Sequence, residues 1–128
     1  MNLDAEINNE IFRKDYKPVI AKNRHLASLA ATRLKGVGTD YQAGTVLAKN
    51  TVDGLFYAYN NAGSSGLDTA SCVLMETIAD NGESTLMGRG IFSGELFKDN
   101  LVGYDAAAKT DLGAREYTAS DSINIVKF

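Results

Sequence analysis

The chain has no tryptophan and only one cysteine, one histidine and one proline among its 128 residues. The single cysteine, Cys72, excludes an internal disulfide framework and any cysteine-rich zinc site. The single histidine, His25, excludes metal sites built from several histidines. The N-terminus is acidic and no apolar run approaches the roughly 18–20 residues that cross a bilayer, so neither a signal peptide nor a membrane partner is expected. We therefore expect a soluble protein of a reducing compartment.

Glycine is also absent from the first part of the chain, since all twelve glycines lie at or after Gly36. Charge divides at the same place. Residues 11–35 carry seven bases against Asp15 alone, whereas residues 36–128 carry six bases and twelve acids. We therefore predict a basic, flexible N-terminal extended arm over residues 1–35 and one acidic, mainly β domain over residues 36–128.

From Gly36 onward, short runs of β-type residues alternate with turn residues. The expected strands cover residues 45–49, 55–59, 71–78, 88–97 and 122–128. The Asp53-Gly54 pair between the first two runs suits a tight hairpin. Several glycines fall in the run at 88–97, which indicates a bulge or a close approach of another backbone.

Helix signals are few. Residues 105–109 and 111–116 each fit a short helix, and Asp105 is suited to cap the first. Residues 23–35 stay open between helix and strand, because their leucines fit a helical stripe while the same run can be extended. Strands at intervals of about 8–12 residues favour a small, mainly β fold with one or two short helices.

No catalytic, cofactor-binding or metal-binding residues are indicated. A nucleophile needs a base and a group that orients the base, but His25 lies in the basic arm. Cys72 falls inside an apolar strand pattern, which is typical of a buried and inert thiol. Residues 36–39 lack the Lys-Ser or Lys-Thr pair of a phosphate-binding loop. We therefore expect a protein that is not an enzyme and needs no cofactor.

The positive charge of the arm raises the question of nucleic-acid binding. Residues 12–17 combine Lys and Arg with Phe and Tyr, as in segments that neutralise phosphates and stack on bases. The net negative charge of residues 36–128 would repel a polyanion. We therefore expect no direct nucleic-acid partner.

Several stretches agree in character and order with one known family. They are residues 44–49, the Asp53-Gly54 turn with Tyr57, residues 69–75, residues 90–92 with Leu96, and residues 122–126. From about residue 44 to residue 128 the chain resembles the head decoration proteins of tailed phages, the family of the phage lambda capsid decoration protein D. The long basic arm, the scarcity of proline and the lack of tryptophan depart from the pattern of that phage lambda protein.

The resemblance implies a small β-clip-like domain that assembles as homotrimers on the outer surface of an expanded phage head. The trimers would sit at three-fold and quasi-three-fold sites, and they would clamp neighbouring capsomers against the pressure of packaged DNA. The implied partners are the major capsid protein of the same phage and further copies of the chain. The implied location is the virion, after synthesis in the host cytoplasm.

In that family the N-terminal segment orders on the shell and adds a strand to capsid elements. The arm of this chain combines β-compatible apolar residues with positive charge, so it suits pairing with a strand edge. The expected capsid-binding residues are Ile7, Ile11, Phe12, Arg13, Lys14, Tyr16 and Lys17. The apolar and aromatic members would fill shell pockets, and the three bases would meet capsid acids.

Two alternatives stay open. One is a small β-fold module that binds nucleic acid or carbohydrate, and the other is a trimeric β-clip nucleotide hydrolase. The hydrolase would need a phosphate-binding loop of the Gly-Arg-Ser-Ser type, and residues 88–91 read Gly-Arg-Gly-Ile instead.

Overall fold

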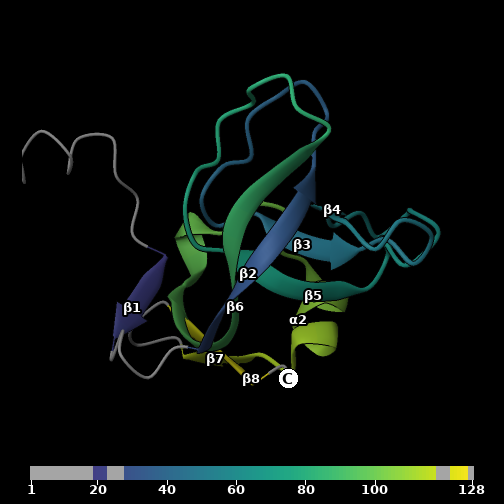
Figure 1. Ribbon diagram of the computed structural model, residues 1–128. Coiled ribbons are helices and arrows are strands. Elements are labelled where there is room, and N and C mark those ends of the chain that lie inside the picture. Colours follow the sequence, from purple (N-terminus) through teal and green to yellow (C-terminus); the bar gives the residue numbers. More distant parts are fainter. Residues whose placement is uncertain (1–18, 23–27, 118–121, 127–128) are drawn as a thin grey trace, which may run out of the picture.

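The computed structural model describes residues 19–22, 28–117 and 122–126, and over these residues the expected mainly β fold with short helices is confirmed (Figure 1). The strands are β1 (Ile20–Lys22), β2 (Ser28–Lys35), β3 (Val46–Lys49), β4 (Phe56–Ala58), β5 (Ala70–Leu74), β6 (Thr85–Phe97), β7 (Arg115–Tyr117) and β8 (Ser122–Val126). The helices are the 3-10 helix η2 (Lys98–Asn100) and α2 (Ala106–Leu112).

Five of the strands close into a small barrel. Their order is β2-β4-β3-β5-β6, and β6 pairs again with β2. The β2–β6 seam is antiparallel and runs from the pair Ser28–Ser93 to the pair Lys35–Thr85. The β2–β4 seam consists of one parallel pair, Leu34 with Phe56. The barrel is therefore closed by one long seam and one very short seam.

Strand β6 is 13 residues long and organises the sheet. Ile91 pairs with Leu29 of β2 on one edge and with Val73 of β5 on the other. Further along, β6 pairs with β1 and with β8. Four of the other strands thus contact β6 directly, and the remaining part of the sheet is built outward from them.

Two hydrophobic clusters fill the two sides of the sheet. The cluster on the barrel side contains Leu34, Tyr41, Leu47, Cys72, Leu74 and Leu86. The larger cluster packs α2 and β8 against the opposite face, and its fully buried members include Val46, Val73, Ile91, Leu96, Ala108, Leu112, Ile123 and Ile125. Since successive side chains of a strand point to opposite faces, Val73 and Leu74 contribute to different clusters.

The predicted hairpin and glycine approach are confirmed. β3 and β4 pair antiparallel around the turn that contains Gly54, whose φ of 74° is in the left-handed region. A Cβ built at Gly90 would lie 2.7 Å from Thr32 Oγ1 and 2.9 Å from Cys72 Sγ. Such distances leave no room for a side chain, so glycine at position 90 lets β6 pass close to β2 and β5.

The strand expected over residues 71–78 ends early, at Leu74. Beyond it the chain turns into the loop that leads to β6, and Ile78 forms an isolated bridge with Tyr41. Ile78 still packs against the barrel-side cluster, as its alternation with Leu74 indicates. The apolar alternation therefore extends beyond the strand pairing.

One or two short helices were expected, and in this region the structure has one α-helix, α2, which overlaps both of the expected segments. Asp105 caps α2 as predicted, because its side chain accepts a hydrogen bond from the Ala108 N–H at 2.8 Å. The second expected helix, over residues 111–116, is wrong. Gly113 adopts φ 62° and ends the helix at Leu112, after which the chain enters β7. A glycine in the left-handed conformation is a common helix terminator.

The structure also places part of the predicted arm in the sheet. Residues 28–35 form β2, so the helical alternative is wrong for them, whereas residues 23–27 lie outside the described residues. Thr32 and Leu34 are buried while Arg33 is exposed, which is the two-residue period of a half-buried strand. Val19 is also buried, at 1% exposure. The folded part therefore begins well before residue 36.

Candidate interaction surface

The seven expected capsid-binding residues all lie outside the described residues. They are Ile7, Ile11, Phe12, Arg13, Lys14, Tyr16 and Lys17. The described chain begins with Val19 and β1, which joins the edge of β6 beyond the end of β2. The candidate surface is therefore built from the strands that directly follow the arm.

The edge of β2 that faces away from β6 is open over most of its length. Among the described strands, only β4 pairs with this edge, and it does so at Leu34 alone. Residues 28–31 read Ser-Leu-Ala-Ala, and all four are exposed. An edge of this kind presents unpaired N–H and C=O groups and can accept an extended segment of another protein.

The other free edges are better protected. β7 and β1 are three residues long, and β7 carries Arg115 and Glu116. Short length and charge are the usual means by which proteins prevent edge-to-edge pairing. β2 is eight residues long and carries no charge over residues 28–31, so it is the least protected edge in the described part of the chain. The sequence did contain a signal for this strand, in the alternation over residues 32–35.

The outward face of the β2–β6 pair carries basic and apolar side chains together. Arg33 pairs across from Met87, and Ala31 pairs across from Arg89. Met87 is 58% exposed and Leu29 is 37% exposed. Arg89 is bound to Glu76, with nitrogen–oxygen distances of 3.2 and 3.3 Å. We call Leu29, Ala31, Arg33, Met87 and Arg89 together the β2–β6 face.

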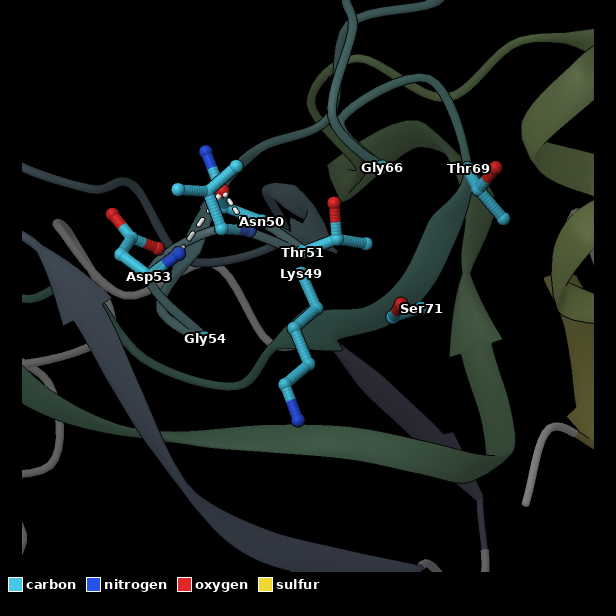
Figure 2. Close-up of a pocket in the computed structure, with 9 residues that line it drawn as sticks. Lys49, Asn50, Thr51, Asp53, Gly54, Gly66, Thr69 and Ser71 are labelled. Carbon is cyan, nitrogen blue, oxygen red and sulfur yellow. Dashed lines mark hydrogen bonds between the residues drawn. The ribbon is translucent and has the colours of Figure 1, made fainter.

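A shallow polar hollow lies beside the β3–β4 turn (Figure 2). The Asn50 side chain accepts hydrogen bonds from the backbone N–H groups of Val52 and Asp53, which fixes the turn. Thr51, Thr69 and Ser71 supply the hydroxyl groups of its lining. None of the nine lining residues is aromatic, so the hollow offers no aromatic surface on which a base could stack.

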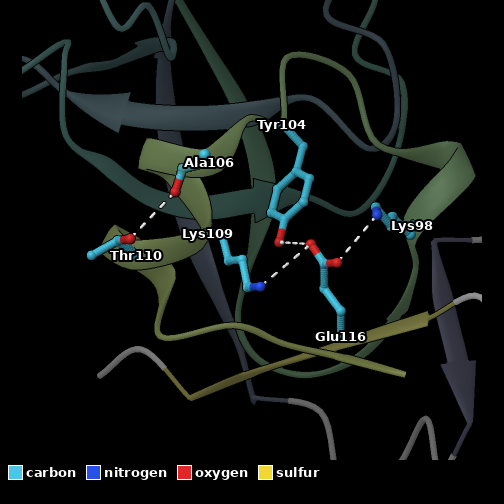
Figure 3. A network of polar contacts seen from close by, with 6 residues as sticks. All are labelled: Lys98, Tyr104, Ala106, Lys109, Thr110 and Glu116. Carbon is cyan, nitrogen blue, oxygen red and sulfur yellow. Dashed lines mark hydrogen bonds and ion pairs between the residues drawn. The ribbon is translucent and has the colours of Figure 1, made fainter. Parts of the chain in front are cut away.

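A second polar group joins η2, α2 and β7 (Figure 3). Glu116 lies 3.3 Å from Lys98 Nζ and 3.9 Å from Lys109 Nζ, and it accepts a hydrogen bond from the Tyr104 hydroxyl at 3.2 Å. The hydrogen bond from Lys98 is the largest of the contacts that lower the Glu116 pKa. Burial is the main cause that raises the pKa of Tyr104 to about 12. All four side chains are used in holding the C-terminal elements together.

Among the described residues, no three His, Cys, Asp or Glu side chains lie close enough to hold a metal ion. Cys72 is fully buried as expected, and burial raises the pKa of its thiol to about 12. Residues 88–90 lie in the middle of β6 rather than in a loop. Within the described ranges, no helix has the length and apolar character needed to cross a membrane.

Comparisons of the chain with protein-family models, with curated proteins and with solved structures give no match. The function must therefore be argued from the open β2 edge and the charges around it.

Proposed function

We propose that the chain is a viral capsid decoration protein that stabilises the expanded head of a tailed phage. It binds as trimers at three-fold and quasi-three-fold sites on the outside of the shell, and it clamps neighbouring capsomers. It acts through binding alone, without a cofactor or substrate. Its partners are the major capsid protein and two further copies of itself.

The observation that carries this proposal is the open edge of β2. Strand addition gives affinity through main-chain hydrogen bonds, so an exposed sheet edge offers a clamp a direct contact for an extended segment of its partner. The edge at residues 28–31 supplies backbone groups for such pairing. The basic arm precedes it in the chain, so the arm and the edge can bind adjacent parts of one acidic shell surface.

The architecture supports a β-clip-like domain. The barrel is small and closed, and the described residues contain one α-helix, which packs on the outside of the sheet (Figure 1). Ordering the arm on the shell costs about 1–2 kcal/mol per residue, so each copy alone binds modestly. Three linked copies bind more tightly, because the second and third contacts form at high effective concentration.

The two alternatives have less support. In a nucleotide hydrolase the segment at residues 88–90 would have to form a phosphate-binding loop, but it lies within β6 and Arg89 is bound to Glu76. A module that binds single-stranded nucleic acid would combine aromatic side chains with positive charge. The hollow beside the β3–β4 turn has no aromatic lining residue, and a second hollow beside β4, which contains Tyr41 and Tyr57, has Asp40 as its one charged lining residue.

The test is co-sedimentation with expanded, empty phage heads from the source system. The full chain is compared with a chain that begins at Val19, which keeps the buried Val19 side chain and β1 in place. We expect saturable binding of three copies per three-fold site, and loss of binding on removal of the arm. If the full chain stays in the supernatant at saturating heads, the proposed function is wrong.

The contribution of the β2 edge is tested with Ala30→Lys, at an exposed edge position outside the β2–β6 face. A lysine on an edge strand opposes pairing with a further strand. Ala62→Lys is the matched control, because it adds the same charge at an exposed position in the β4–β5 loop. We expect Ala30→Lys to weaken binding to the heads while Ala62→Lys binds as the unaltered chain does. Equal binding by the two variants would exclude the edge as the contact.

A further inference from the structure

A groove of about 370 Å³ lies beside β4. Its apolar lining comes from three separate parts of the chain, namely the β2–β3 loop, β4 with the loop after it, and the segment after η2. The apolar and aromatic members are Val37, Tyr41, Tyr57, Ala58, Leu67 and Val102. Val37 is 52% exposed and Val102 is 48% exposed, so the groove presents apolar surface to its opening.

The groove has an acidic rim. Asp40 is its one charged lining residue, and it is exposed. Asp80 lies next to it, since the Asp80 backbone N–H donates a hydrogen bond to Asp40 Oδ1 at 2.7 Å. The surface therefore suits an apolar side chain that is accompanied by a positive charge.

The β2–β6 face has this complementary chemistry. Met87 is the most exposed large hydrophobic side chain of the described strands, and Arg33 lies directly across from it. Arg33 forms no ion pair with any other described residue, whereas Arg89 is bound to Glu76. An exposed methionine beside an unpaired arginine matches the apolar and acidic character of the groove.

Among the described residues, four of the six exposed large hydrophobic side chains lie on these two surfaces: Leu29 and Met87 on the β2–β6 face, Val37 and Val102 in the groove. We propose that the groove of one copy receives the β2–β6 face of a second copy. Met87 then packs against Val37 and Val102, and Arg33 approaches Asp40. This inference rests on the self-association in the proposed function and identifies its interface.

The two surfaces share no residue, so their union is head-to-tail. Head-to-tail contacts generate a closed ring when the rotation between copies closes, and three copies make the smallest ring beyond a pair. The contact uses the side chains of Leu29 and Ala31 but leaves the backbone edge of residues 28–31 available, because the side chains of a strand stand on the faces of the sheet while its N–H and C=O groups lie in the plane of the sheet. A trimer formed in this way keeps three open edges for the shell.

The test is thiol cross-linking with a short bismaleimide, in concentrated solution and again with expanded heads. One variant carries Met87→Cys and Val102→Cys together. We expect covalent dimers and trimers of the 13.7 kDa chain, with a product that stops at three because the ring is closed. Cys72 is fully buried and gives no background. The matched control pairs Met87→Cys with Val52→Cys, at a position outside the groove that is 82% exposed.

The charge contact is tested by adding Arg33→Glu to the same double-cysteine variant. Like charges at an interface are strongly unfavourable, so we expect the yield of trimer to fall about tenfold. A control variant that carries Val102→Cys and Val52→Cys should give no trimer, whether Arg33 is kept or changed by Arg33→Glu. An unchanged yield with Arg33→Glu would overturn the proposed pairing of Arg33 with Asp40.

The outcomes separate this inference from the proposed function. Equal cross-linking of the two double-cysteine variants overturns the interface, and so does dimer formation by Met87→Cys alone. If the chain binds heads but the Met87–Val102 variant gives no trimer in either condition, the interface is wrong and capsid binding stands. If trimers form in solution but the chain does not bind to phage heads, the interface stands and the proposed function is wrong.

Discussion

The hydroxyl of Tyr59 donates a hydrogen bond to Asp105 Oδ1 at 2.9 Å, and the same oxygen accepts the backbone N–H of Ala108 at 2.8 Å. One carboxylate therefore caps α2 and ties it to the segment that follows β4. The pKa of Tyr59 is raised to about 12, mainly by burial and secondly by the hydrogen bond to Asp105. The helix is positioned over the sheet by this contact as well as by its buried residues.

Asp105→Ala should be more destabilising than Tyr59→Phe. The first change removes the cap, which is worth about 0.5–2 kcal/mol, together with the contact to Tyr59. The second change removes one hydrogen bond, worth about 1 kcal/mol. The free energy of unfolding, measured with urea for both variants and the unaltered chain, checks the order. Equal losses would mean that the cap contributes nothing.

Gly90→Ala should destabilise the barrel by about 1–3 kcal/mol, as expected for an atom forced into a packed interior. The added methyl would meet Thr32 Oγ1 at 2.7 Å and Cys72 Sγ at 2.9 Å. Combining it with Cys72→Ala removes one of the two contacts, so the double variant should lose less stability than the sum of the single variants. Thermal unfolding of the four chains tests this, and simple additivity would contradict it.

Stability should fall as the pH rises above the ordinary range of cysteine and tyrosine. The pKa of Cys72 is raised from 9.0, and those of Tyr59 and Tyr104 from 10.0, each to about 12. The folded chain therefore holds these protons more tightly than the unfolded chain, and the stability they add is lost between about pH 9 and pH 12. Unfolding by urea at a series of pH values measures the slope.

A Cys72→Ala variant provides the control for the alkaline experiment. Its stability should decline less steeply, because one of the three groups no longer releases a proton on unfolding. The intact thiol should also react with a maleimide only after denaturation, since its side chain is fully buried. Rapid labelling of the native chain at neutral pH would contradict this arrangement.

Glu116→Gln should flatten the acid side of the stability profile. Contact with Lys98, supported by Lys109, lowers the pKa of Glu116 below its ordinary value of 4.5. A lowered pKa adds stability above pH 4.5 that is lost as the pH falls through the folded value. Glu83→Gln, at an exposed loop position, is the matched control. If the free energy of unfolding depends on acidic pH in the same way in the two variants, the Glu116 contacts do not affect stability.

Local features of the fold followed from the sequence, and distant pairings did not. The Asp53-Gly54 turn and the Asp105 cap depend on neighbouring residues and were predicted correctly. β2 was assigned to the arm because it lies in the basic, glycine-free part of the chain. Its place is decided by pairing with β6, from Lys35 with Thr85 to Ser28 with Ser93, which is at least 50 positions away in the sequence, and local pattern carries little information about such contacts.

The interaction surfaces show the same division. The sequence pointed to charge in the arm, but those residues lie outside the described ranges. The open edge of β2 and the groove beside β4 depend on which strands do not meet and on loops that converge from three parts of the chain. No spacing rule predicts a partner that is missing. Alternation in residues 32–35 was the one available signal.

Strand β6 also determines how the molecule responds to pulling. β1, β2, β5 and β8 all pair with it, so tension that enters through the N-terminal segment passes to β6 before it reaches the helix or the C-terminal strands. β1 contributes two pairs to this route and β2 contributes eight. Because β1 has the shorter pairing, we expect tension applied at the N-terminal end to detach β1 from β6 before it separates β2 from β6.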